Sequence, residues 1–202
     1  MLVIGLTGGI GTGKTEVAKK LQELGAKLIE ADKLGHLAYQ PHSHPWRMVT
    51  EKFGTDILGE NNEVDRKKLG AIVFSDPSAL AILNSIMQPW IADMARNLIV
   101  EYRKARQKVV VLEAAILIEA GWDSLVDEIW VTTAPEPHVV SRLEKRNNFS
   151  LDDIKARINS QLPEANRINR AEVVIENSGD LNDLSNQIET LWKSRIEIKK
   201  RG

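Results

Sequence analysis

The chain has 202 residues and no cysteine, which suits one α/β domain with a sizeable core and excludes disulfides and cysteine metal sites. Its 27 basic and 28 acidic side chains give a formal net charge of -1, whereas a nucleic-acid-binding protein normally carries a basic excess. No apolar run approaches the roughly 18 residues of a membrane-spanning helix, and Met1 leads directly into a strand-like segment. We therefore expect a cytoplasmic protein without nucleic-acid or membrane partners.

The first motif follows an apolar segment at the N-terminus. Leu2–Thr7 reads as a short buried strand, and the next eight residues, from Gly8 to Thr15, match G-x-x-x-x-G-K-[ST] without a mismatch. Apolar residues at helical spacing continue from Lys14 to Leu24. Glycines let successive N–H groups turn toward an anion, and the start of the helix adds partial positive charge. This pattern predicts a nucleoside-triphosphate site, with Lys14 at the β- and γ-phosphates and Thr15 as a Mg²⁺ ligand.

Further strands are expected at 27–29, 109–112, 128–132 and 173–175, whereas 33–106 shows only helical patterns. Within that region we expect a turn between Pro41 and Pro45, short helices over 65–74 and 77–86, and a longer helix that starts after Pro89. Helices are also expected from Pro135 to a break at 147–148, over 151–160 and over 181–198. The last of these presents one apolar face, composed of Leu181, Leu184, Ile188 and Leu191. Strands separated by helices predict an α/β fold with a doubly wound parallel sheet.

Three carboxylates follow two of the expected strands or lie in the loops after them. A phosphotransferase needs a carboxylate that orients the acceptor hydroxyl, and Asp32 lies just past the second strand, at the sheet edge that the glycine loop shares. Asp32 could also cap a helix over 33–39, and the two roles are compatible. Glu113 is either a Walker-B acid or a solvated strand end. Glu119 lies in an apolar stretch, and either it or Glu113 could hold the Mg²⁺ shell.

Two arginines in the expected helix after Pro135 are candidates for phosphate binding. Arg142 and Arg146 are four residues apart and therefore share a helix face. They either close over the transferring phosphate or belong to a solvated basic face. The sequence has no N-K-x-D motif of the kind that reads guanine, which argues against a GTPase switch.

The combination of these residues resembles the dephospho-CoA kinase family, over almost the whole chain and in the family's order. The residues that carry the resemblance are Gly5–Thr15, Leu24–Ala26, Glu30–Asp32, Phe53-Gly54, Asp65-Arg66, Leu69-Gly70, Val73-Phe74, Leu117–Glu119, Arg142 with Arg146, Ala156–Ile158 with Gln161, and Ala171–Asn177. Some local patterns, such as Leu34-Gly35-His36, look like the kinase domain of animal bifunctional CoA synthase. The chain departs from the usual family pattern at Glu30, where Asp is common, and at His36 and Gln88.

The resemblance implies ATP- and Mg²⁺-dependent phosphorylation of the ribose 3′-hydroxyl of dephospho-CoA, the last step of CoA synthesis. It implies that Asp32, Lys14 and Arg142 are catalytic, with Asp32 as base or orienter for the hydroxyl. The implied substrate contacts come from Asp32, Arg66 and Glu119, and Thr15 is the implied metal ligand. The implied nucleotide contacts are Gly8, Gly9, Ile10, Gly11, Thr12, Gly13, Lys14, Thr15, Glu16, Arg146 and Asn177, the last of them near the adenine.

One P-loop kinase domain is expected over 1–202. Its core would comprise 1–32, 107–134 and 171–202, with an inserted helical substrate-binding region over 33–106 and a helical lid over 135–170. Two other interpretations share the glycine loop. Another small-molecule kinase, such as a nucleoside kinase, would act on a different acceptor, and a nucleotide-binding regulator would have no acceptor at all.

Overall fold

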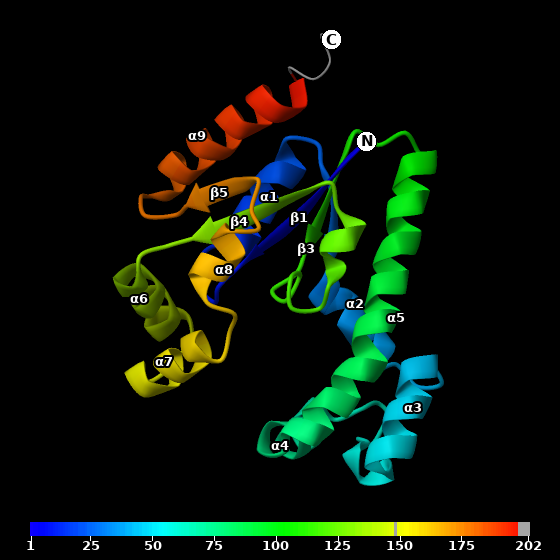
Figure 1. Ribbon diagram of the computed structural model, residues 1–202. Helices are drawn as coiled ribbons and strands as arrows, with labels where there is room; N and C mark the ends of the chain where they lie inside the picture. Colours follow the sequence, from blue (N-terminus) through cyan, green and yellow to red (C-terminus); the bar gives the residue numbers. More distant parts are fainter. Residues whose placement is uncertain (148, 198–202) are drawn as a thin grey trace. The chain divides into compact units, whose positions relative to one another are not determined.

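A computed structural model of the protein describes residues 1–147 and 149–197. Two compact units make up the chain (Figure 1): the first comprises Met1–Ile29 with Ile99–Gly202, and the second comprises Glu30–Leu98. The first unit holds the sheet, whereas the second is built from helices. None of the helices in the described part of the chain has the length and apolar character that crossing a bilayer requires.

The sheet confirms the expected α/β class. Its strands are β1 (Leu2–Gly8), β2 (Lys27–Glu30), β3 (Val109–Glu113), β4 (Glu128–Thr133) and β5 (Val173–Glu176), in the spatial order β2-β3-β1-β4-β5. β1 pairs in parallel with β3 and with β4, and β4 pairs in parallel with β5. Each expected strand is present and ends one residue later than its apolar run, because polar or glycine residues at the strand ends still pair with their neighbours.

Side chains of a strand alternate between the two faces of the sheet, so apolar side chains on each face need a covering layer. On one face, α1 (Lys14–Glu23) and α9 (Leu181–Trp192) pack against alternate residues of the strands, such as Ile4 and Leu6, in one buried cluster. Gly5 faces the other way. A Cβ at Gly5 would lie only 2.7 Å from the Leu117 Cδ2 atom, so the segment after β3 packs directly on the β1 backbone.

The rest of the first unit consists of short helices. They are η2 (Trp122–Leu125), α6 (Glu136–Asn147), α7 (Leu151–Asn159), α8 (Glu164–Ile168) and a π-helical turn, η3 (Lys193–Glu197). The expected closing helix over 181–198 is present as α9, which η3 continues as a π-helical turn, and residue 198 lies outside the described part of the chain. Leu181 was expected on its buried face, but its relative exposure is 67%. This side chain is in the first turn, directly after the capping residue Asp180, where the helix projects beyond the core.

The second unit contains α2 (Ala31–Ala38), α3 (His44–Phe53), η1 (Thr55–Ile57), α4 (Arg66–Ser75) and most of α5 (Pro77–Lys104). The turn expected between Pro41 and Pro45 is partly wrong, since Pro45 lies in the first turn of α3. There the missing N–H of proline costs little, and Ser43 caps the helix by accepting a hydrogen bond from the Trp46 amide.

The expectation of separate helices on either side of Pro89 is wrong, because α5 runs through this proline without a break. Leu83, Ile86 and Met87 before it, and Ile91 and Ala95 after it, form one continuous series of buried residues. A proline inside a helix costs about 3 kcal/mol. Burying each large apolar side chain contributes about 1.5–3 kcal/mol, so the buried face outweighs the local cost.

Candidate active site

The glycine loop occupies residues 9–13, between the end of β1 and the start of α1, as its sequence predicts. Gly13 is the N-cap of α1 and has φ 100° and ψ 19°, a left-handed conformation that glycine adopts without strain. A Cβ at Gly13 would lie 2.2 Å from the Asn177 Nδ2 atom. Both the backbone angle and the close approach therefore require glycine here. The resulting turn directs the first amides of α1 toward the loop, where an anion can bind.

Buried side chains from neighbouring strands brace the loop from behind. The Thr12 and Thr132 hydroxyl oxygens are 2.7 Å apart, and the Thr12 hydroxyl also donates to the Gly9 carbonyl at 2.9 Å. Asn177, which directly follows β5, donates from Nδ2 to the Thr12 carbonyl at 3.0 Å. Thr12 and Asn177 are only 3% and 5% exposed. These bonds fix the loop in the absence of a ligand, which reduces the cost of ordering it when phosphate binds.

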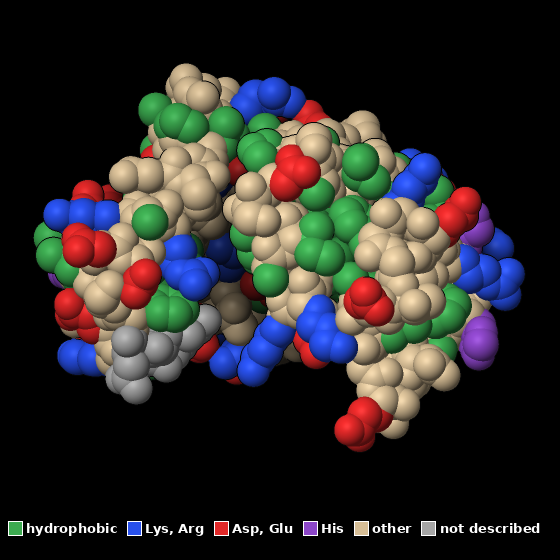
Figure 2. All heavy atoms as spheres, turned by 90° about the horizontal axis from the view of Figure 1, so that it is seen from below, with side chains coloured by type: hydrophobic (Ala, Val, Ile, Leu, Met, Phe, Trp, Pro, Cys, Tyr) green, Lys and Arg blue, Asp and Glu red, His purple; other side chains and the backbone are tan. Residues whose placement is uncertain are grey.

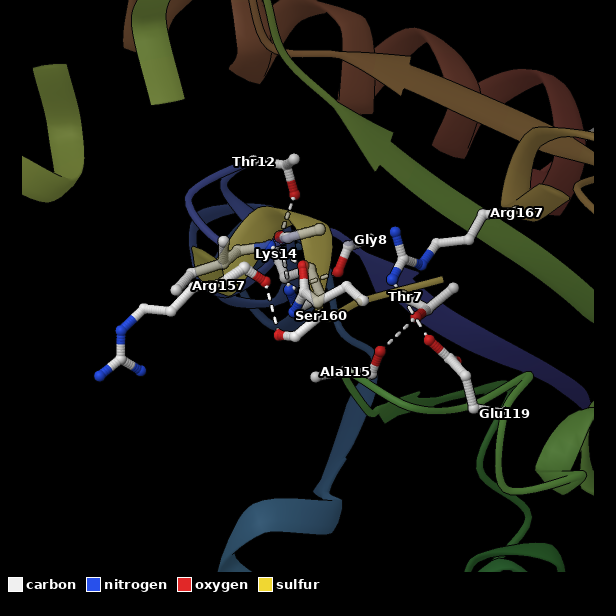
Figure 3. A network of polar contacts seen from close by, with 12 residues as sticks. Thr7, Gly8, Thr12, Lys14, Ala115, Glu119, Arg157, Ser160 and Arg167 are labelled. Carbon is white, nitrogen blue, oxygen red and sulfur yellow. Dashed lines mark hydrogen bonds and ion pairs between the residues drawn. The ribbon is translucent and has the colours of Figure 1, made fainter. Parts of the chain in front are cut away.

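Lys14 folds back over this loop. Its Nζ atom donates to the Gly8 carbonyl at 2.8 Å and to the Gly9 carbonyl at 3.0 Å (Figure 3). The ammonium group therefore lies at the first glycines of the motif. In a P-loop this is the group that reaches the β- and γ-phosphates.

Thr15 and Glu113 lie together at the edge of the loop, as the metal-site hypothesis requires. The Thr15 hydroxyl donates to Glu113 Oε1 at 3.4 Å. A hydroxyl and a carboxylate are the hard oxygen ligands that suit Mg²⁺, which usually keeps several waters and takes its other ligands from substrate phosphates. The pair fits such an ion even though no group of three His, Asp or Glu side chains with metal-binding geometry occurs among the described residues.

The Arg142 side chain contacts the glycine loop, and its hydrogen bond there goes to a backbone carbonyl of the loop. Its guanidinium donates to the Gly11 carbonyl at 3.3 Å, to the Asn177 carbonyl at 3.0 Å and to Asn177 Oδ1 at 3.1 Å. The residue thus belongs to the bracing of the loop, and its contact with a transferring phosphate stays a prediction. The Arg146 side chain lies outside the described residues.

A partly buried ion pair that the sequence did not predict lies near the first glycines of the loop. Arg167, from α8, donates from Nη2 to Glu119 Oε1 at 3.2 Å, and the relative exposures of the two side chains are 4% and 26%. Nearby, Gln161 Oε1 accepts a hydrogen bond from the Ile10 amide at 2.8 Å. Arg167 and Gln161 also line a pocket of about 360 Å³ together with Gly9, Ile10 and Thr12. Glu119 was predicted to bind substrate, and the structure shows that its partner is an arginine.

Asp32 belongs to the helical unit. The alternative role of capping a helix over 33–39 is wrong: α2 starts at Ala31, and its N-cap position is Glu30, without a side-chain cap bond. Asp32 is instead an exposed residue in the first turn, two residues after β2 ends. It makes no hydrogen bond or ion pair to any residue that the structure describes. No structural contact in the described part of the chain therefore accounts for a carboxylate at this position.

Arg66, the other predicted substrate residue of the helical unit, lies in a pocket of about 280 Å³ with His36, Tyr39 and Gln40. Asp65 caps α4 by accepting hydrogen bonds from the following backbone amides, and these bonds lower the pKa of its carboxyl. This cap makes Arg66 the first residue of the helix. The Arg66 guanidinium contacts His36 Nε2. Burial raises the pKa of the Tyr39 phenol, while the positive charge of Arg66 acts in the opposite direction.

The Glu16 side chain forms an exposed ion pair with Lys19 at 2.9 Å, and its contact with the nucleotide stays a prediction. Figure 2 shows basic and acidic side chains interspersed over one face of the molecule, in keeping with the net charge of -1. The face in this view therefore carries no broad basic surface, and the candidate phosphate ligands are the individual cations described above.

Comparisons with known proteins agree with this geometry. A family model described as dephospho-CoA kinase matches residues 2–183. The dephospho-CoA kinase of Dehalococcoides mccartyi is 39% identical over 198 residues, which cover 98% of this chain and 100% of the relative. The dephospho-CoA kinase of Carboxydothermus hydrogenoformans is 41% identical over 201 residues, which cover 98% of each chain.

Solved structures share the fold. A crystal structure from Thermus thermophilus has a TM-score of 0.78 at 29% identity and covers 96% of this chain and 97% of its own. A dephospho-CoA kinase from Campylobacter jejuni has a TM-score of 0.75 at 24% identity, with 98% of both chains covered. A shikimate kinase from Acinetobacter baumannii, with a TM-score of 0.56 at 17% identity, shares the fold alone and covers 96% of this chain and 94% of its own. The near full-length sequence match and the glycine loop with its lysine together show that the chain belongs to the dephospho-CoA kinase family.

Proposed function

We propose that this chain transfers the γ-phosphoryl group of ATP to the ribose 3′-hydroxyl of dephospho-CoA and so completes CoA. The observation that supports the proposal most strongly is the braced glycine loop with Lys14 over its first two carbonyls, in a chain of this family. The loop amides and Lys14 would hold the β- and γ-phosphates. Thr15 and Glu113 would hold Mg²⁺, which withdraws charge from the phosphates when it is bound.

Asp32 supplies the second half of the proposal. The role of Asp32 is supported by its position in the chain. β2 belongs to the sheet, and Asp32 follows the end of β2 by two residues. Parallel sheets bind ligands beyond the carboxyl ends of their strands. An exposed carboxylate without a structural partner can accept the proton of the acceptor hydroxyl and keep the oxygen in line with phosphorus. Arg66 would contact the CoA side of the acceptor. The cytoplasmic location and the helical lid over 135–170 stay predictions.

A panel of acceptors tests the function. The purified chain is incubated with γ-labelled ATP and Mg²⁺, and separately with dephospho-CoA, adenosine, a pyrimidine nucleoside and shikimate. We expect label transfer to dephospho-CoA with a kcat/KM at least about 10²-fold above that for the others, since a site built for one acceptor leaves polar groups unpaired with another. Efficient transfer to a nucleoside with none to dephospho-CoA would assign a different kinase. ATP turnover with no acceptor phosphorylated would contradict kinase function.

A further inference from the structure

Arg167 is a buried cation whose hydrogen-bonding capacity is largely unused. The residue is 3% exposed, and Glu119 is its one hydrogen-bond partner within the described chain. Its Nε atom is buried and has no partner among the described residues. A guanidinium carries five N–H donors, and a buried donor without an acceptor destabilises the fold. A ligand that accepts hydrogen bonds here would pair these N–H donors. Because the guanidinium is positively charged, an anion suits it best.

The guanidinium lies at the same end of the glycine loop as the Lys14 ammonium. A Cβ placed on Gly9 would be 3.9 Å from Arg167 Nη1, and Lys14 Nζ bonds the carbonyls of Gly8 and Gly9. Figure 3 shows the Arg167 side chain extending toward Gly8 and Glu119. The pocket of about 360 Å³ that Gly9, Ile10 and Arg167 line opens at this point. Because a P-loop lysine marks the position of the β- and γ-phosphates, Arg167 would lie beside the terminal phosphates of a bound nucleotide.

Other arginines of this unit are engaged elsewhere. The Nη atoms of Arg142 donate to backbone and amide oxygens at Gly11 and Asn177. Arg157 is exposed, and its guanidinium stacks 4.3 Å from the Phe149 ring centroid. Figure 3 shows its side chain pointing away from Lys14. Arg167 therefore has the free donors and the location that these two lack.

We infer that Arg167 is a catalytic residue that binds the transferring phosphoryl group, and that Glu119 positions it. This inference rests on the proposed kinase function. As the bond from the γ-phosphorus to the ADP oxygen breaks and the bond to the acceptor oxygen forms, Arg167 donates to the non-bridging γ-oxygens and stays protonated. The hydroxyl proton goes to the Asp32 carboxylate. Glu119 holds the Nη2 atom of the guanidinium, which leaves Nη1, the nitrogen that faces Gly9, for phosphate.

The first experiment compares Arg167→Met with Arg170→Met. Arg170 lies three residues away and pairs with Asp123 at an exposed position, so it controls for the loss of an arginine and of an ion pair. In Arg167→Met, kcat on dephospho-CoA should fall by at least about 10², the effect of losing one preorganised charge donor. The ADP affinity should stay within about threefold, because the arginine acts on the γ-phosphoryl group. Arg170→Met should match the wild type.

A transition-state analogue gives a readout that a purely structural role would not change. Aluminium fluoride, bound together with ADP and dephospho-CoA, mimics the phosphoryl group in the transition state of its transfer. The wild type and Arg170→Met should bind ADP at least about 10²-fold more tightly when fluoride and dephospho-CoA are present, and Arg167→Met should lose that gain. Added guanidinium ion should restore part of the activity of Arg167→Met. An Arg167→Met protein that keeps more than a tenth of wild-type kcat overturns the inference.

Replacing a buried arginine that pairs with a carboxylate can destabilise the fold, so a second variant is needed as a control. Should Arg167→Met melt well below the wild type, Arg167→Lys decides, because lysine keeps the charge next to Glu119 but lacks the planar fork. A tenfold or larger fall in kcat supports the inference, and an unchanged kcat overturns it. A wild type that never phosphorylates dephospho-CoA refutes the proposed function instead. If the wild type phosphorylates dephospho-CoA and the Arg167 variants are fully active, only the role of Arg167 is refuted.

Discussion

The glycine loop and the helical unit Glu30–Leu98 differ in how far the polar side chains of their candidate sites are buried and hydrogen-bonded. Around the loop, Thr12, Arg167 and Asn177 are nearly buried, and each is bonded to backbone or to another side chain. In the helical unit, Asp32 and Arg66 are exposed on the first turns of α2 and α4. Under the proposed function, the donor phosphates would meet a site that is already built, whereas the acceptor would meet exposed side chains in the first turns of helices. Changes near the loop should affect ATP handling, and changes in the helical unit should affect the acceptor.

The largest effect expected in the helical unit follows Asp32→Asn. The substitution removes the charge that accepts the proton, so kcat should fall by about 10² to 10⁴. Melting temperature and ATP affinity should stay near wild type, because Asp32 is exposed and is not the cap of α2. Asp93→Asn, an exposed acid on α5 in the same unit, is the matched control and should be silent. Calorimetry and steady-state kinetics on one preparation check both. A variant that retains more than a tenth of wild-type kcat would give the role to another acid, first Glu119.

On the loop side of the comparison, Lys14→Ala should lower kcat by about 10² or more, since one electrostatic stabiliser of the transferring group is lost. The fold should survive because the Lys14 side chain lies over the loop and not in the core cluster. Lys19→Ala, on an exposed position of α1, serves as the control. Near-normal kcat in Lys14→Ala would mean that the loop does not hold the transferring phosphate.

A smaller effect is expected where the loop is braced. Arg142→Ala removes three hydrogen bonds to Gly11 and Asn177, so kcat/KM should fall at least about tenfold, with a raised KM for ATP. Lys155→Ala, an exposed charge on α7, should change little. Equal losses at the two positions would point to a diffuse basic surface. A loss in kcat with no change in the KM for ATP would favour direct contact of Arg142 with the transferring phosphate over bracing.

The smallest effect should come from Arg66→Gln, and on the acceptor alone. One charge-assisted contact is worth about 1.5–3 kcal/mol, so the KM for dephospho-CoA should rise about tenfold or somewhat more, while the KM for ATP and kcat stay near wild type. Lys67→Gln, the next residue of α4 and also exposed, controls for the loss of positive charge. A rise in the KM for ATP would break the division between the two regions.

The sheet and the loop were predictable because their signals are local. Short apolar runs between helical segments identify strands, and the glycine motif has one conformation that suits its purpose. Pro89 was misread because its local preference favours a helix start, while a buried face on both sides of it carries α5 through. The alternative role of Asp32 as a helix cap is wrong for a similar reason: aspartate often caps helices, but α2 begins directly where β2 ends.

Arg167 could not be recognised from the sequence. It lies in α8, a five-residue helix that is too short for an apolar period, among charged and polar neighbours that look solvated. Its partner Glu119 is 48 residues away in the chain, and only the fold brings the two together. Glu119 itself was noticed because a carboxylate beside an apolar run needs a reason. Its ion pair with the buried Arg167 is one such reason.

The position of the phosphate in the product tests the central claim most directly. The wild-type chain is incubated with ATP, Mg²⁺ and dephospho-CoA, and the product is analysed by mass spectrometry and ³¹P NMR beside authentic CoA. The account predicts a product that carries one more phosphate than dephospho-CoA, on the ribose 3′-oxygen, and that serves a CoA-dependent enzyme. A phosphate at any other oxygen, or dephospho-CoA recovered unchanged while ATP is consumed, would contradict it.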